Sequence, residues 1–352
     1  MSQLGEVSAI ARKTIKYGSI ALIAMMIGRS MMGMAYHWWK LRHPDPPPPP
    51  DVKFGKLPQL KFPKQNPEKF TYSLETPTGG LPTKLPKQEV VYFMPIRKPS
   101  LMAYDEAENI ARELDFIEKP FKISESKYRW SGKIADLPSV LTMDIITGEF
   151  RWEKKWRVDD SFLIPTMLIS KDKAVQIVKK QLSKLDLLAD DLDSGIDKVS
   201  FWKVQGNQLV PAISLSKAQF VKVNLFRAPI KDMPVLTINP ETGLVNALIG
   251  LQKEEKRQIL TLEFKYFPVA RSQKATYPLI GIQQAWQRLQ AGQAFIAQKP
   301  QTNKAVAIAE IYLAYYDANE PQEFLQPIYV FEGKNFRAYV PAVADEWVSR
   351  KE

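Results

Sequence analysis

Two stretches of the chain share one pattern: Leu141-Thr142-Met143-Asp144-Ile145-Ile146-Thr147-Gly148 and Leu236-Thr237-Ile238-Asn239-Pro240-Glu241-Thr242-Gly243. The common form is L-T-x-[D/N]-x-x-T-G, an apolar strand that runs into a tight turn. Asp or Asn caps such a turn with its side chain, and Gly accepts a positive φ. Apolar residues resume after each copy, at 150–152 and 244–248. Each copy therefore predicts a β-hairpin.

A helix is expected before each hairpin. Residues 104–114 and 171–188 place their apolar side chains on one face, and Ser170 fits the N-cap of the second helix. A third helix, at 282–289, is closed by Ala291-Gly292 and followed by apolar runs at 307–316, 325–332 and 336–343. The order of helix and antiparallel sheet thus occurs three times. It predicts an α+β fold, with helices packed on one face of curled sheets.

The N-terminal part contains an apolar run at 18–36. Extended to Trp39, the run is long enough to cross a bilayer as a helix. Trp38, Trp39 and Lys40 predict an interfacial anchor at its end. Arg29 lies within the run, where a charge costs about 2.5–3.5 kcal/mol on insertion scales. We expect its side chain to reach the interface or to face a partner helix.

A cleaved signal peptide is the alternative for this segment, because basic residues precede the run and Gly33-Met34-Ala35 resembles a cleavage site. Five consecutive prolines, Pro46–Pro50, predict a stiff polyproline II spacer beyond the helix. Residues 53–70 continue this extended stretch, and its apolar side chains Phe54, Leu57, Leu60 and Phe62 are expected to contact the folded body. The predicted organisation has a tail, a transmembrane helix, a Pro-rich stalk and three α+β modules, at residues 1–16, 17–39, 40–70, 71–158, 159–252 and 253–352.

The hairpins and the last strands resemble known families. A helix with strands that end in D-x-x-T-G resembles PepSY-type modules. The C-terminal runs Ile311–Tyr316, Leu325–Gly333 and Ala338–Val343 resemble the last domain of YycH/YycI-like proteins. Those are bacterial single-pass proteins whose extracytoplasmic domains modulate a membrane sensor histidine kinase. The resemblance implies PepSY/YycI-like modules behind a membrane anchor, and a regulatory rather than catalytic role.

The composition excludes several kinds of active site. The chain has no cysteine, and its two histidines, His37 and His43, both lie beside the apolar run. The predicted modules therefore lack the residues for a thiol nucleophile, a Ser–His–Asp triad or a His-ligated metal. Two acidic clusters, Asp159-Asp160 and Asp190-Asp191-x-Asp193, are expected to be solvated loops, since a calcium loop would need a central Gly. We expect no enzyme, cofactor or metal.

The expected function is a non-enzymatic interaction or regulatory protein, anchored in the cell membrane through residues 17–39. Its C-terminal domain is expected outside the cytoplasm, where it would contact another membrane or envelope protein. Three basic residues before the run, against Lys40 and Arg42 after it, give a thin bias towards a cytoplasmic N-terminus, and long C-terminal domains translocate largely regardless of charge. The net charge is +11, but no nucleic-acid-binding motif accompanies it, so nucleic acid is not expected.

The alternative function is the binding of an anionic polymer of the cell envelope. The stretch 151–157 interleaves aromatic and cationic side chains, and Trp152, Trp156 and Arg157 are its candidate binding residues. The structural alternative is a strand with Trp inside and Lys and Arg outside. A second candidate binding face, expected to be exposed, consists of Tyr316, Gln326 and Tyr339.

Overall fold

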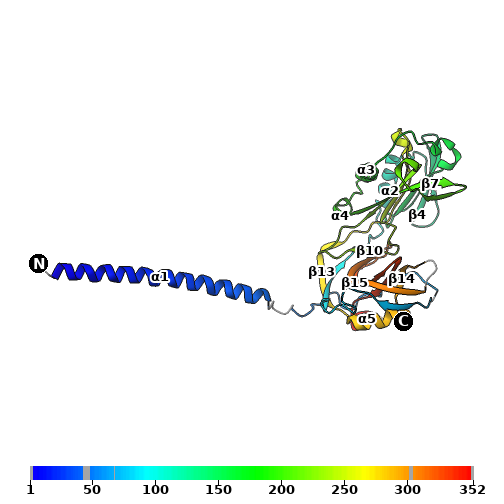
Figure 1. Cartoon of the computed structure of the whole chain (residues 1–352). Helices are drawn as coiled ribbons and strands as arrows, with labels where there is room; N and C mark the ends of the chain where they lie inside the picture. Colours follow the sequence, from blue (N-terminus) through cyan, green and yellow to red (C-terminus); the bar gives the residue numbers. More distant parts are fainter. Residues whose placement is uncertain (1–2, 43–47, 67, 301–303, 350–352) are drawn as a thin grey trace. The chain divides into compact units, whose positions relative to one another are not determined.

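The computed structural model describes residues 3–42, 48–66, 68–300 and 304–349 (Figure 1). Within the first helix it describes the side chains from Lys13 to Lys40 and that of Arg42. The chain forms two compact units, Met1–Pro49 and Pro50–Glu352. The second unit is called the body below.

The first unit contains one long helix, α1 (Gln3–Arg42). Its part from Lys13 to Lys40 is long and apolar enough to cross a membrane, and the side chains of this part are exposed within the described structure. Arg29 lies inside this span, and the guanidinium of Arg42 stacks on the ring of Trp38 at 3.8 Å. Length and composition therefore agree with the predicted membrane segment at 17–39.

The body contains a nine-stranded antiparallel sheet in one lobe (Figure 1). Helices α2 (Ala103–Glu113) and α3 (Lys171–Lys184) contribute Ala107, Ala111 and Val178 to its core. In spatial order its strands are β3 (Phe121–Lys122), β4 (Lys127–Ile134), β5 (Leu137–Asp144), β6 (Phe150–Lys154), β12 (Ile259–Phe264), β11 (Val245–Gly250), β9 (Phe220–Phe226), β7 (Ile196–Gln205) and β8 (Gln208–Pro211).

The other lobe is built on an eight-stranded sheet, on which helix α5 (Ile282–Gln290) packs with Ala285 and Leu289 (Figure 1). Two short strands pair in parallel with its longest strand, β15, and the remaining pairs are antiparallel. Its strands are β1 (Thr71–Leu74), β2 (Gln88–Phe93), β10 (Val235–Thr237), β13 (Ala270–Pro278), β14 (Phe295–Gln298), β15 (Ala305–Asp317), β16 (Phe324–Gly333) and β17 (Phe336–Pro341).

The α+β class is confirmed, but the strands of the three expected modules are distributed over two sheets. Strand β6 pairs with β12, from Phe150 opposite Phe264 to Glu153 opposite Thr261. This pairing closes the edge that β6 would expose in a separate module, and it fuses two sets of strands into one sheet. Strands β1 and β2, which precede the first predicted helix, belong to the other sheet.

The three predicted helices are present as α2, α3 and α5. Ser170 caps α3 as expected, because its hydroxyl accepts a hydrogen bond of 3.2 Å from the amide of Lys173. Helix α3 ends at Lys184 instead of reaching residue 188. The backbone of Asp186 has a φ of 55°, which a right-handed helix does not accommodate.

The first copy of the repeated pattern forms the predicted hairpin. One carboxylate oxygen of Asp144 accepts hydrogen bonds from the amides of Ile146 and Thr147, at 3.0 and 3.1 Å. Gly148 has a φ of 79°, and β5 pairs with β6 on either side of this turn. The turn chemistry of the sequence accounts for this hairpin completely.

The second copy does not form a hairpin, which corrects the prediction. Strand β10 pairs with β15 of one sheet, whereas β11 begins the return of the chain into the other sheet. Asn239 still caps its turn, since it accepts a hydrogen bond of 2.9 Å from the amide of Glu241. Gly243 serves a close approach instead of a positive φ, because a Cβ there would lie 2.3 Å from the carbonyl oxygen of Leu225.

The segment Leu57–Phe62 lies on the body, although the stalk was predicted to extend to residue 70. Leu57 is fully buried; its amide donates to the carbonyl of Trp347, and its carbonyl accepts from the amide of Ser349, both at 2.8 Å. Phe62 stacks on Phe295 with 5.0 Å between ring centroids. We call Leu57–Phe62 the covering segment. The first prolines of the predicted spacer lie outside the described residues.

Candidate functional site

The predicted binding face of Tyr316, Gln326 and Tyr339 is not exposed. The exposed fractions of these residues are 0%, 3% and 0%. The covering segment is the reason. The hydroxyl of Tyr316 donates to the carbonyl of Lys61 at 3.2 Å, and the side-chain amide of Gln326 donates to the carbonyl of Pro58 at 2.8 Å. The chain itself occupies this face.

The second predicted set, Trp152, Trp156 and Arg157, is divided between different surroundings. Trp152 lies on the helix-covered face of the nine-stranded sheet. Trp156 belongs to a separate apolar cluster, where its ring is tilted against that of Phe220 and lies under the guanidinium of Arg157. The expectation of Trp inside and basic residues outside holds for Trp152, Trp156 and Arg157, but it is wrong for Lys154, which is 1% exposed.

A cavity of about 810 Å³ opens beside Lys154. It lies between the C-terminal end of α2, one side of α3, the sheet and the 3₁₀ turn Glu255–Arg257. We call it the lysine cavity, because five lysines and three acidic residues line it. Its lining residues are Glu113, Leu114, Asp115, Ile134, Trp152, Lys154, Lys173, Gln176, Ile177, Lys180, Gln181, Lys184, Glu255, Lys256, Gln258 and Ile259.

The ammonium of Lys154 lies on the floor of this cavity. It donates a hydrogen bond to the carbonyl of Lys256 and sits 4.6 Å above the ring of Trp152. An ammonium has three N–H donors. Within the described part of the chain, the carbonyl of Lys256 is the one hydrogen-bond acceptor it meets. Burial lowers the pKa of Lys154 to about 8, against the attraction of Asp115.

Trp152 brings a second donor to the same place. Its indole N–H is buried and has no acceptor among the residues that the structure describes. A buried donor without a partner costs roughly 1–3 kcal/mol. The floor of the lysine cavity therefore holds one cation and one neutral donor whose hydrogen-bonding capacity the protein does not fill.

The rim of the cavity carries further lysines. Lys173, Lys180 and Lys184 follow one another at helical spacing and share the side of α3 that lines the cavity. Lys180 and Lys184 lie 2.6 and 3.8 Å from Glu255, and all three of these side chains are more than half exposed. The hydrogen bond from Lys180 lowers the pKa of Glu255. Exposed pairs of this kind exchange partners readily, since each contributes about 0–1 kcal/mol.

The acidic clusters have structural partners. Asp159 caps the turn Asp160–Leu163 through the amide of Ser161 and pairs with Arg257 at 2.5 Å. Asp191 belongs to the short helix α4 (Asp190–Asp193) and pairs with Arg227. Among the described residues, no group of three or more His, Cys, Asp or Glu side chains is arranged to hold a metal ion.

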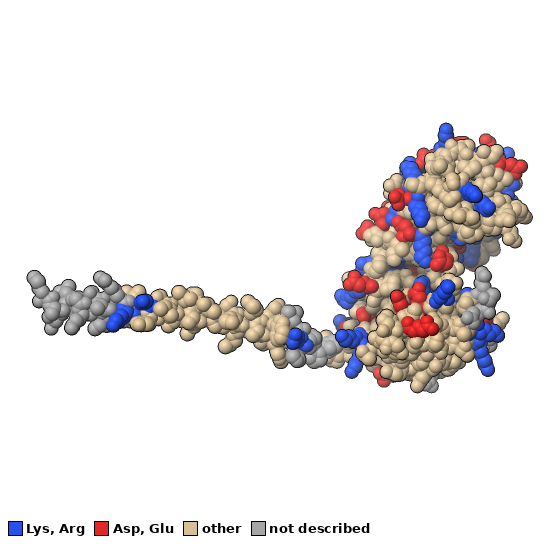
Figure 2. Space-filling view, in the orientation of Figure 1, with Lys and Arg blue, Asp and Glu red and all other residues tan. Residues whose placement is uncertain are grey.

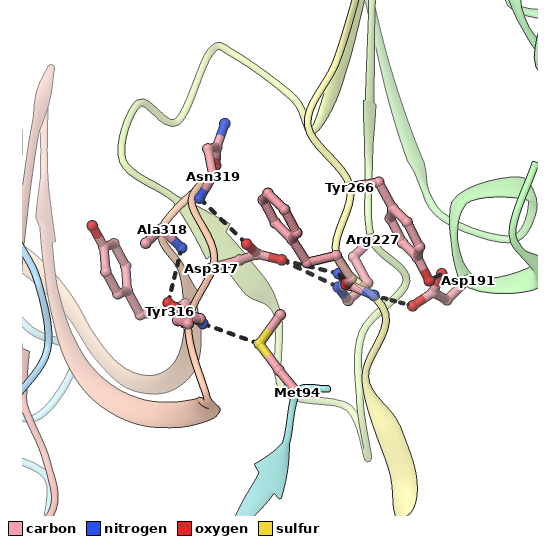
Figure 3. Close-up of polar contacts among 10 residues, drawn as sticks. Met94, Asp191, Arg227, Tyr266, Tyr316, Asp317, Ala318 and Asn319 are labelled. Carbon is pink, nitrogen blue, oxygen red and sulfur yellow. Dashed lines mark hydrogen bonds and ion pairs between the residues drawn. The ribbon is translucent and has the colours of Figure 1, made fainter. Parts of the chain in front are cut away.

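Arg227 forms the centre of a buried charge cluster between the two sheets (Figure 3). It follows β9 in one sheet, and its guanidinium lies 3.1 Å from the carboxylate of Asp317, at the end of β15 in the other. It also pairs with Asp191, whose other oxygen accepts from the hydroxyl of Tyr266 at 2.8 Å. Burial alone would lower the pKa of Arg227, but the carboxylates of Asp317 and Asp191 outweigh burial and raise it. The cluster joins the lobes.

Sequence reasoning placed Lys154 outside and passed over the lysines of α3. The signal was nevertheless present. In a strand, residues two apart face the same side, so a buried Trp152 implies an inward Lys154. The spacing of Lys173, Lys180 and Lys184 likewise indicates one side of a helix. Residues of α3 and of β6 line the same cavity. No local pattern in the sequence predicts this, because the arrangement depends on the pairing of β6 with β12.

Comparisons with known proteins do not assign this chain to a family. No family model matches the chain, and no curated protein matches it. A solved structure, an uncharacterized protein from Eubacterium rectale ATCC 33656, is similar over 72% of this chain and 82% of its own. The identity is 12% and the TM-score is 0.34, a likeness too low to carry an argument. The resemblance to PepSY and YycH/YycI-like proteins stays a prediction, and the site rests on its own geometry.

Proposed function

We propose that this chain is a membrane-anchored, non-enzymatic binding protein whose body recognises an anionic ligand in the lysine cavity. The anchor would be α1, with the body outside the cytoplasm. The ligand would then be a component of the cell envelope or a solute that reaches it. This proposal develops the alternative function that the sequence suggested at residues 151–157.

One observation supports the proposal. Among the described residues, the buried N–H donors on the floor of the lysine cavity have too few hydrogen-bond acceptors. Lys154 is fully buried yet meets a single neutral acceptor, the carbonyl of Lys256. Burying a cation without an opposite charge is costly, so proteins usually pair such groups or use them. An anion in the cavity would supply the missing acceptors. It would also supply the missing charge, because a nearby negative group favours the ammonium form of Lys154.

A regulatory partner in the membrane is a second candidate function, and Arg29 favours it. This residue is a cation inside the candidate membrane span of α1. Gly33 lies one helical turn after Arg29 on the same side of α1, and small residues at such positions let two helices approach closely. We propose that another membrane protein pairs with α1 there, and that binding in the body acts through this partner.

The experiment is a thermal unfolding series on the full chain in nanodiscs of neutral phosphatidylcholine. Sodium sulfate and sodium citrate are added at constant ionic strength. Wild type is compared with Lys154→Met, which removes the cation from the floor, and with Lys217→Met, which removes an exposed lysine outside the cavity.

We expect both anions to raise the melting temperature of wild type and of Lys217→Met more than that of Lys154→Met, which keeps only the general stabilisation by excluded anions. Ligands stabilise the form that binds them, which is the basis of this readout. An equal rise in all three proteins would place the anion effect outside the cavity. No rise in any protein would remove the basis of the proposal.

A further inference from the structure

The lysine cavity has the size and the floor of a site for an organic molecule. Its volume of about 810 Å³ lies in the range of small-molecule sites, roughly 300–1,000 Å³, and far exceeds that of an inorganic anion. Leu114, Ile134 and Ile259 line it and are 2%, 3% and 5% exposed. Water against this apolar floor is released when an apolar body covers it.

We infer that the ligand is an amphiphilic organic anion, with its anionic group on Lys154 and its apolar body against Leu114, Ile134 and Ile259. This inference rests on the proposed function and narrows it to a chemical class. The side chain of Ile177, on α3, would close over the same apolar body, because it also lines the cavity and is half-buried.

The polar end of this ligand is specified by two donors. Lys154 offers the N–H groups that the carbonyl of Lys256 does not use, and Trp152 offers its unpartnered indole N–H. A carboxylate, sulfonate or phosphate has two or more oxygens and can accept from both donors at once. The ammonium lies 4.6 Å from the centroid of the indole ring, so both donors belong to the same part of the floor.

The surroundings favour a single anionic group over an extended polyanion. Glu113, Asp115 and Glu255 share the wall of the cavity with the lysines, and a chain of repeated negative charges would lie against these carboxylates. On the face shown in Figure 2, lysines and arginines are interspersed with acidic residues over both lobes. A long basic track, which a polyanion needs, is not seen on that face.

The test is isothermal titration calorimetry of the full chain in phosphatidylcholine nanodiscs. The heats measured with empty nanodiscs are subtracted. The probes are naphthalene-2-sulfonate, its uncharged analogue naphthalene-2-sulfonamide, octane-1-sulfonate and inorganic sulfate. The first two share a body and differ in charge. The two sulfonates share a charged group and differ between a flat ring and an alkyl chain, which separates an aromatic solute from a lipid-like ligand.

We expect at least one sulfonate to bind about tenfold or more tightly than both sulfate and the sulfonamide. Lys154→Met should lose that tighter binding. Ile177→Gln should weaken binding of the sulfonate and leave sulfate binding unchanged, because it alters the apolar wall alone. Val175→Gln is the matched control, since Val175 is also half-buried on α3 but does not line the cavity.

The outcomes separate this inference from the proposed function. If sulfate binds through Lys154 and neither sulfonate binds more tightly, an anion site exists and the amphiphilic class is wrong. If the sulfonamide binds as tightly as the sulfonate, the cavity selects apolar bodies and the inference is wrong. If no anion binds, the inference and the proposed function fail together.

Discussion

Lys154 makes the body less stable than its packing alone would allow, and this cost depends on pH. Burial lowers its pKa from 10.5 to about 8. Between these values the unfolded chain holds a proton that the folded body has released, so stability rises with pH. The free energy of unfolding should increase by about 2 kcal/mol between pH 8 and pH 9.5 because of this residue. Urea unfolding at both pH values measures the change.

Lys154→Met is the control for this pH dependence. It keeps an unbranched side chain of similar length and removes the titrating group, so the difference between wild type and variant isolates Lys154 from other groups that titrate at high pH. Because the ammonium is buried without a carboxylate partner, we also expect the variant to be the more stable protein at pH 7. If the unfolding free energies of wild type and of Lys154→Met change with pH in parallel, then Lys154 does not have a pKa lowered by burial.

Arg227, in contrast to Lys154, stabilises the body through its charge, because it pairs with the carboxylates of Asp317 and Asp191. Arg227→Met would leave the carboxylate of Asp317, which is fully buried, without its cation. Breaking a buried pair in this way typically costs about 3–5 kcal/mol of unfolding free energy. Adding Asp317→Asn should recover much of that loss. Chemical denaturation of the single and double variants measures both effects, with Arg157→Met as an exposed control. A loss below about 1 kcal/mol in the single variant would contradict this role.

At the residue scale, the sequence predicted those positions whose roles are set by near neighbours. Asp144, Gly148 and Ser170 have the expected roles because each acts within a few residues of itself. Tyr316 and Tyr339 were misplaced for the opposite reason. Alternation along a strand shows which residues share a side, but not whether another segment covers that side.

The covering segment packs on the body more closely than the sequence predicted. Its apolar residues were expected to touch the body, yet the interval was assigned to a stalk. In the structure Leu57 is as buried as any core residue, and both its N–H and its C=O form hydrogen bonds with the segment 347–349. This segment therefore contributes to the stability of the body.

We expect Leu57→Ala to lower the free energy of unfolding by about 3 kcal/mol, as for other fully buried leucines. The same change should release the covering segment, so that limited proteolysis cuts near residues 57–62 before the rest of the body. Ile213→Ala, at a side chain that is 92% exposed, should alter neither property. A segment that stays protected while stability is unchanged would mean that Leu57 does not hold it.

The two copies of L-T-x-[D/N]-x-x-T-G show how far local signals reach at the element scale. Both copies make the expected capped turn, at Asp144 and at Asn239. Only the first continues into a hairpin, because β10 is captured by β15, a partner about 80 residues away in the chain (Val235 lies opposite Tyr315). Turn residues specify a turn, and they do not specify which sheet receives the next strand.

At the scale of the whole molecule, the order of helix and strand patterns predicted the class of fold, and the apolar run predicted the candidate membrane helix, but neither predicted the grouping of strands. The pairing of β6 with β12 joins residues more than 100 positions apart, with Glu153 opposite Thr261. Such long-range pairing leaves no periodic trace in the sequence. The lysine cavity depends on that pairing, which explains why the sequence pointed to Trp152 alone and not to the site.

The proposed anchorage has a direct test. If α1 spans the membrane and the body lies outside the cytoplasm, the full chain should resist extraction with alkaline carbonate, and added protease should digest the body in intact spheroplasts. Intact mass should show that the N-terminal residues are retained. Protection until lysis would place the body in the cytoplasm. Loss of the N-terminal residues would identify α1 as a signal sequence.

The measurement that tests the central claim most directly is a ¹³C NMR titration of the lysine Cε carbons in the full chain, with and without citrate. We predict one lysine that titrates near pH 8, is missing from Lys154→Met, and shifts upward by about one pH unit or more when citrate is bound. A Lys154 signal that titrates near 10.5, or that does not respond to the anion, would contradict the account.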